Sequence, residues 1–211
     1  MPVDAGKPST TAARAPVALL LVDVINDMDF PGAERLVRHA LPMARRIARL
    51  KKRAARAGIP AIYVNDNFGQ WRSDFRRTVQ YCTTADVPGR EASRLLEPGS
   101  DDYFVLKPKH SGFYATTLDV LLEELGVRTI ILTGVAGNIC VLFTANDAYM
   151  RDLGLYVPAD CIASNTVREN RYALEQMKTV MKAVVTPSTK LPLAKLVAAR
   201  RPRPRRGRGR G

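Results

Sequence analysis

Short apolar segments alternate with helical patterns along this chain, and this alternation restricts what it can fold into. Residues 17–25 and 128–133 are runs of valine, leucine and isoleucine with few polar side chains, which is typical of strands buried on both faces. Further strands are expected at residues 61–64, 103–106, 155–157 and 183–185, and helices at residues 34–57, 91–96, 116–125, 138–152 and 168–181. Strands and helices that alternate at this spacing form right-handed βαβ units. We therefore expect an α/β fold whose parallel sheet is covered by helices on both faces.

Proline and glycine mark the limits of the longest expected helix, at residues 34–57. Pro42 suits a first-turn position at which the helix restarts, and Gly58 followed by Pro60 is an ordinary stop signal. Residues 65–89 show no sustained periodicity and are expected to be a long irregular stretch. Long ordered loops are often functional, so this segment is a candidate determinant of specificity.

The length of 211 residues fits one folded domain, which we place at residues 16–189. Residues 1–15 are small and polar and are expected to be disordered. The three cysteines are scattered and odd in number, which argues against a disulfide framework and favours a reducing compartment. No apolar run reaches the roughly 20 residues that cross a bilayer, and the N-terminal segment does not resemble a signal peptide. The expected location is therefore cytoplasmic.

The positive charge of the chain is concentrated in two places. The formal net charge is +13, and seven arginines lie in residues 200–211, within the Arg/Pro/Gly-rich tail expected at residues 190–211. Much of the remaining excess lies between residues 45 and 56. This distribution describes a tail and one helix face rather than a binding groove, so nucleic acid is an alternative partner and not the leading one.

Three chemically active side chains fall where expected strands end. Asp23 lies near the end of the first strand, Lys107 follows the third, and Cys140 follows the fourth at the start of a helix. Ligands of open parallel sheets bind beyond the carboxyl ends of the strands, and unsatisfied N–H groups at a helix start favour a thiolate. A carboxylate can take the thiol proton, an ammonium can stabilise the thiolate, and the thiol can attack a carbonyl.

Three segments in register resemble the isochorismatase-like cysteine hydrolase family. They are LLLVDVINDMDF, VLKPKHSGFYATTLDVLLEELGV and TIILTGVAGNICVLFTANDAYMRDLGLYVPADCIAS, and the resemblance spans about residues 16–185. It implies a Rossmann-like three-layer α/β/α sandwich with a six-stranded parallel sheet and an Asp23–Lys107–Cys140 triad. It also implies hydrolysis of C–N bonds in small amides and carbamoyl compounds through a thioester. A cis peptide at Val135–Ala136 would aim the N–H groups of Ala136 and Cys140 at an oxyanion.

This chain departs from the family pattern at several positions. Nicotinamidases of the family carry a metal site with histidines after the second strand, where this chain has YVNDNFGQW, and its two histidines, His39 and His110, are far apart. We therefore expect neither a metal nor another cofactor. Isochorismate hydrolases lack the cysteine, so Cys140 favours amide-type chemistry. The family glutamine is replaced by Ile25, which predicts a different pocket beside the first strand.

Four residues on the expected rim segments are candidates for substrate binding. They are Phe30, Asn65, Trp71 and Phe113. Phe30 and Phe113 match aromatic pocket positions of the family, whereas Asn65 could equally cap its strand and Trp71 could equally be a core residue. His110 could contact substrate, although a solvated loop residue is the plainer interpretation.

Other interpretations of the chain stay open at this stage. Cys140 could be a small buried hydrophobe and Asp23 a structural carboxylate. The chain could also bind a polyanion through its basic tail, or be a hydrolase-like scaffold with little turnover. The leading hypothesis is a hydrolase of a small amide-type substrate that forms a homodimer or homotetramer.

Overall fold

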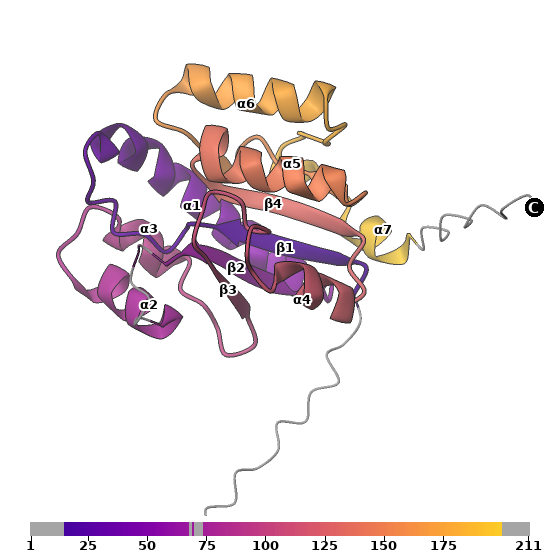
Figure 1. Cartoon of the computed structure of the whole chain (residues 1–211), viewed down its shortest axis with the longest axis horizontal. Coiled ribbons are helices and arrows are strands. Elements are labelled where there is room, and N and C mark those ends of the chain that lie inside the picture. Colours follow the sequence, from indigo (N-terminus) through magenta and orange to yellow (C-terminus); the bar gives the residue numbers. More distant parts are fainter. Residues whose placement is uncertain (1–14, 68, 70–73, 200–211) are drawn as a thin grey trace, which may run out of the picture.

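The computed structural model describes residues 15–67, 69 and 74–199, and its centre is a six-stranded parallel sheet (Figure 1). The strands are β1 (Val17–Val22), β2 (Ala61–Asp66), β3 (Tyr103–Lys107), β4 (Thr129–Val135), β5 (Gly154–Tyr156) and β6 (Ile162–Ala163). Their order is β3-β2-β1-β4-β5, and β6 pairs with the end of β4. The expected α/β class and the six-stranded parallel sheet are confirmed.

Helices cover both faces of this sheet. The α-helices are α1 (Ala33–Arg56), α2 (Phe75–Thr84), α3 (Arg90–Leu95), α4 (Leu118–Glu124), α5 (Leu142–Met150), α6 (Val167–Thr179) and α7 (Leu193–Ala198). A π-helical turn, η1 (Gly137–Val141), precedes α5, and a 3₁₀ turn, η2 (Ser188–Lys190), precedes α7. Figure 1 shows α5 and α6 lying side by side on one side of the sheet.

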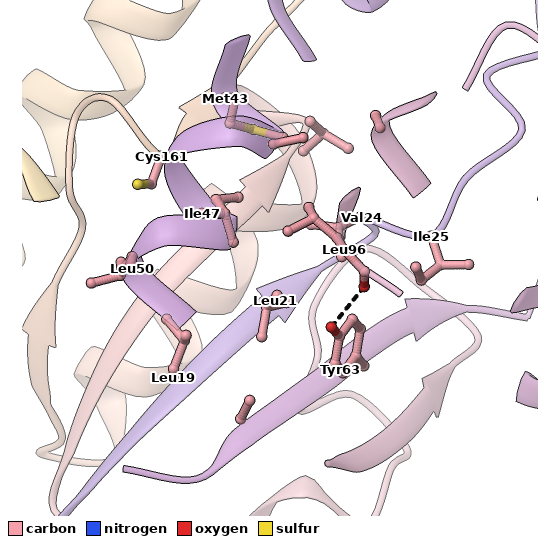
Figure 2. Close-up of a cluster of buried hydrophobic side chains, with 14 of the residues drawn as sticks. Leu19, Leu21, Val24, Ile25, Met43, Ile47, Leu50, Tyr63, Leu96 and Cys161 are labelled. Carbon is pink, nitrogen blue, oxygen red and sulfur yellow. Dashed lines mark hydrogen bonds between the residues drawn. The ribbon is translucent and has the colours of Figure 1, made fainter. Parts of the chain in front are cut away.

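The side-chain alternation of β1 divides the core into two layers. Leu19 and Leu21 pack with α1, as Figure 2 shows, where Ile47 of α1 lies above them. Leu20 and Val22 point to the other face and join the core under α4, α5 and α6. All six residues of β1 are buried, as a central strand covered on both faces must be.

The sixth strand differs from the expected one. Residues 183–185 were expected to form it, but they contribute only an isolated bridge between Tyr156 and Val184. The sixth strand is β6, whose two residues pair with Gly134 and Val135 at the end of β4. Two residues are too few to show a period in the sequence, whereas Val184 lies at the margin of the sheet and stays 37% exposed.

The stretch at residues 65–89 is not irregular throughout. It contains α2, whose start is capped by the Asp74 carboxylate accepting a hydrogen bond from the Arg77 N–H at 2.9 Å. Phe75 and Cys82 are buried on this helix, and Phe75 stacks on Phe104 with ring centroids 5.2 Å apart. Most of the other side chains of α2 are exposed or half-buried, so the sequence shows only a weak apolar period for this helix.

Packed structure continues past residue 189, where the sequence suggested that a tail begins. Leu191 and Leu193 are buried in the α1 side of the core. The Arg53 guanidinium of α1 donates to the carbonyl oxygens of Ser188 at 2.8 Å and Leu191 at 3.2 Å. The seven tail arginines themselves lie outside the described residues.

Candidate active site

The sheet order brings three of the predicted residues to one edge. Asp23 follows β1, Lys107 is the last residue of β3, and Cys140 lies in η1 directly after β4. The carboxyl ends of parallel strands meet at one edge of a sheet, and β2, between β3 and β1, adds its last residue, Asp66.

Lys107 lies at the centre of this group. Its side chain is fully buried, and Nζ is 2.9 Å from Oδ2 of Asp23 and 3.6 Å from Sγ of Cys140. Nζ also donates to the Lys109 carbonyl at 3.2 Å and lies 3.5 Å from Oδ2 of Asp66. A buried ammonium needs such partners, and these contacts fix it between the carboxylate and the thiol.

The Asp23 carboxylate is oriented by the neighbouring strand. The main-chain N–H of Asp66 donates to its Oδ1 at 2.7 Å, while Oδ2 faces Lys107. Asp23 has φ +49°, a left-handed conformation that aspartate tolerates better than most residues. The chain therefore turns sharply as β1 ends, and the carboxylate stays at the strand edge with 4% residue exposure.

Close backbone packing positions the turn that carries Cys140. Gly134 has φ +118°, and a Cβ atom there would lie 2.0 Å from the Val22 carbonyl oxygen, so glycine is required. The peptide bond between the next two residues, Val135 and Ala136, is cis, at the position that the family resemblance implies. The Ala136 carbonyl then accepts hydrogen bonds from the N–H groups of Ile139 at 3.0 Å and Val141 at 3.2 Å.

The helix expected from residue 138 therefore begins as a π turn and becomes α-helical only at Leu142. The two residues that donate hydrogen bonds to the Ala136 carbonyl, Ile139 and Val141, lie on either side of Cys140 in the sequence. π-Helical turns are frequent at functional sites. That the N–H groups of Ala136 and Cys140 bind an oxyanion stays a prediction.

Burial and charge set the protonation of these groups. Burial raises the pKa of Asp23, and the nearby Lys107 cation only partly opposes this. Burial, followed by the Asp23 charge, raises the pKa of the Cys140 thiol to about 12, although Lys107 acts to lower it. Burial would lower the pKa of Lys107, but its attraction to Asp23 and Cys140 outweighs burial and the pKa is raised. At neutral pH the resting site therefore holds a protonated thiol and an ammonium.

His110 lies beside the Cys140 thiol. Its Nδ1 is 3.8 Å from Sγ of Cys140, and its ring packs against Phe143 with centroids 5.5 Å apart. The plainer interpretation, a solvated loop residue, is correct about its exposure but not about its surroundings. The available signal was its place three residues after Lys107, in the segment that follows β3.

Two of the four substrate-binding candidates have buried side chains that bond or pack within the fold. Asn65 is fully buried, and its amide donates to the Ile25 carbonyl at 2.7 Å and accepts from the Ile25 N–H at 3.3 Å. Phe113 is 4% exposed in the core beneath α4 and α5, with the Arg151 guanidinium 4.6 Å from its ring centre. Asn65 thus braces the end of β1 and Phe113 packs in the core, and substrate binding by either residue stays a prediction.

The other two candidates remain predictions. Phe30 is 42% exposed on the loop that enters α1, where its carbonyl accepts a hydrogen bond from Ala33 at 3.0 Å. Trp71 lies outside the described residues. Across residues 15–67, 69 and 74–199, no three His, Cys, Asp or Glu side chains gather in a metal-binding group.

Within the part of the chain that the structure describes, no helix combines the length and the apolar character that a bilayer crossing requires.

Comparisons with known proteins place this site in context. The isochorismatase domain model matches residues 17–189. An uncharacterised isochorismatase family protein, YaaI of Bacillus subtilis, is 45% identical over 174 residues, covering 82% of this chain and 95% of that protein. The ureidoacrylate amidohydrolase RutB of Acinetobacter baylyi is 26% identical over 190 residues, covering 77% of each chain.

Solved structures agree in fold. An isochorismatase family protein from Desulfovibrio vulgaris superposes with a TM-score of 0.69 at 27% identity, covering 88% of this chain and 100% of the other. The N-carbamoylsarcosine amidase of Thermoplasma acidophilum gives a TM-score of 0.63 at 26% identity, covering 83% and 98%.

The fold and the comparisons thus define a hydrolase with a three-layer α/β/α fold around a parallel sheet. More specifically, the chain belongs to the isochorismatase family.

Proposed function

We propose that this protein is a metal-independent cysteine hydrolase that cleaves a C–N bond of a small amide, ureido or carbamoyl compound through a thioester on Cys140. One observation carries the proposal: Nζ of Lys107 lies 2.9 Å from Asp23 and 3.6 Å from the Cys140 sulfur. Lys107 therefore lies close enough to both groups to stabilise a thiolate and to orient the carboxylate that would accept the thiol proton.

Acylation begins with a neutral thiol, because the pKa of Cys140 is raised to about 12. As sulfur bonds to the substrate carbonyl carbon, Asp23 accepts the thiol proton and Lys107 stabilises the charge on sulfur. The N–H groups of Ala136 and Cys140 stabilise the oxyanion. The C–N bond then breaks, the leaving nitrogen takes the proton from Asp23, and a thioester remains.

Deacylation consumes water. With Asp23 as base, a water oxygen attacks the thioester carbonyl, the C–S bond breaks, and the proton taken from water passes to the sulfur, which regenerates the thiol. The relatives support this substrate class by their names, which include a ureidoacrylate amidohydrolase and an N-carbamoylsarcosine amidase. Both names are those of amide-hydrolysing enzymes, an amidohydrolase and an amidase.

The test is a panel of small amides, ureido acids, carbamoyl compounds and lactams, with product formation and intact protein mass followed together. Cys140→Ala is expected to lose at least about a thousandfold in rate and to form no acyl adduct. Cys161→Ala, which removes a thiol that is fully buried near α1, is the matched control and should keep both. Turnover by the Cys140→Ala variant would contradict the proposal.

A further inference from the structure

One buried hydroxyl group connects the loop that follows Lys107 to the turn that carries Cys140. Oγ1 of Thr144, in α5, accepts a hydrogen bond from the Gly112 N–H at 3.0 Å and donates one to the Cys140 carbonyl at 2.7 Å. Thr144 is 0% exposed, and Gly112 is buried as well. These two hydrogen bonds, the Thr144 bridge, use the hydroxyl both as donor and as acceptor, so they hold two segments that are distant in sequence at a set separation.

On the Cys140 side, the bridge completes the restraint of one peptide unit. The N–H of this unit, that of Val141, donates to the Ala136 carbonyl at 3.2 Å, and its carbonyl, that of Cys140, accepts from Thr144. Threonine hydroxyls in helices often bond to the carbonyl four residues earlier, but here that carbonyl belongs to the residue with the reactive thiol. The peptide unit is therefore bonded at both ends, which restrains the backbone of Cys140 and with it the position of Sγ.

On the loop side, the bridge leads back to Lys107. Nζ of Lys107 donates to the Lys109 carbonyl at 3.2 Å, which fastens the start of the loop to the cation. Further along the loop, the Ser111 hydroxyl donates to the Asp147 carboxylate of α5, but the Asp147 side chain is 39% exposed. The bond to Thr144 is the buried one, so removing its acceptor would leave a buried N–H unsatisfied.

The Thr144 bridge spans a gap that the sheet itself does not close. Lys107 ends β3 and Cys140 follows β4, and two other strands, β2 and β1, lie between these strands in the sheet. Nζ of Lys107 is nevertheless 3.6 Å from Sγ of Cys140. A misplacement of about 1 Å between reacting groups can lower a rate about a hundredfold, so a direct bond between the two segments has a consequence for chemistry at the sulfur.

We propose that Thr144 is a positioning residue of this site, an inference that rests on the proposed cysteine mechanism. Its hydroxyl holds the Cys140 backbone and the Lys107 loop together, so that the sulfur meets the substrate carbonyl with the ammonium beside it. Thr144 acts through these two residues and not on the reacting atoms. Serine supplies the same hydroxyl, whereas valine has nearly the shape of threonine and lacks it.

The test measures acylation of Cys140 by p-nitrophenyl acetate, with nitrophenolate release and intact protein mass followed together. Thr144→Val is expected to slow acylation of the folded protein about ten- to a hundredfold, and Thr144→Ser should stay within about threefold of wild type because it keeps the donor and acceptor. Thr83→Val is the matched control. Thr83 of α2 is also buried, its hydroxyl donates to the Val79 carbonyl at 2.7 Å, and its loss should leave the acylation rate unchanged.

The outcomes separate positioning from a purely structural role. Thr144→Val that is acylated as fast as wild type overturns the inference alone, and so does equal slowing in Thr144→Ser or in Thr83→Val. If Thr144→Val does not fold, amide hydrogen exchange of the wild type decides: a slow Gly112 amide supports the bridge, and one that exchanges like an exposed loop amide overturns it. No acetyl adduct on Cys140 of the wild type overturns the proposed thioester mechanism itself.

Discussion

Asp23 influences Cys140 in two opposite ways. As a buried negative charge and hydrogen-bond partner it raises the pKa of the thiol, which makes the resting sulfur a poor nucleophile toward simple alkylating agents. In the proposed mechanism it is also the acceptor of the thiol proton, which makes that same sulfur reactive when a substrate carbonyl is in place. These two effects can be separated by experiment, because only the second requires a base.

Asp23→Asn is expected to have opposite effects on two rates. Substrate turnover should fall at least about a hundredfold because the amide cannot accept the thiol proton. Alkylation of Cys140 by iodoacetamide at pH 8 should become faster, since loss of the Asp23 charge lowers the pKa of the thiol from its value of about 12. In wild type the alkylation rate should still rise above pH 9. Asp66→Asn, 3.5 Å from Lys107, is the control; slower alkylation in Asp23→Asn would contradict the prediction.

Individual residues were predicted unequally well from the sequence. The positions of Asp23, Lys107 and Cys140 at strand ends followed from topology alone. Of the two roles left open for Asn65, the structure shows the one at the strand end, where its buried amide bonds to the Ile25 backbone. His110 was undervalued because its closeness to Cys140 depends on hydrogen bonds between a loop and α5.

At the scale of elements, strong periodic patterns predicted well and short or capped elements did not. α1 and the four longest strands were found near their expected bounds, because long apolar patterns tolerate few alternatives. β6 and α7 are short and depend on neighbours for their burial. The π turn at η1 begins at Gly137, where a Cβ atom would lie 2.8 Å from the Ser164 hydroxyl oxygen, a close approach that periodicity does not reveal.

The docking of η2 and α7 should depend on one α1 side chain. Arg53→Ala removes the donor to the Ser188 and Leu191 carbonyls and is expected to cost about 1–3 kcal/mol in the free energy of unfolding. Arg49→Ala, an exposed arginine one turn earlier on α1, should change it by less than about 0.5 kcal/mol. Urea unfolding of both variants measures the difference, and equal midpoints would show that the contact contributes nothing.

Over the whole molecule, part of the basic surface is used within the fold. Lys51 of α1 pairs with Asp102 and donates to the Tyr63 hydroxyl at 2.9 Å, and Arg53 binds two carbonyl oxygens. These two of the basic side chains between residues 45 and 56 therefore serve folding. The seven arginines of residues 200–211 are the larger concentration of charge, and the polyanion alternative rests on them.

Removing residues 200–211 tests that alternative. The full chain is expected to retard duplex DNA at 50 mM salt and to lose most of this binding at 200 mM, because such binding depends on counterion release. The truncated chain should bind more weakly at low salt while the proposed amide hydrolysis is unchanged. Gel-shift and activity assays on the same preparations give both answers. Retardation that persists without the tail, or that ignores salt, would contradict the prediction.

The donor that orients the Asp23 carboxylate is the backbone N–H of residue 66, not a side chain. Any amino acid except proline supplies that donor, so a substitution at position 66 leaves in place the hydrogen bond that orients the Asp23 carboxylate. A mutational library at this position would therefore vary the chemistry that faces Lys107 while leaving the proton acceptor in place. Among the residues beside the proposed triad, position 66 is the natural starting point for changing which substrates the protein accepts.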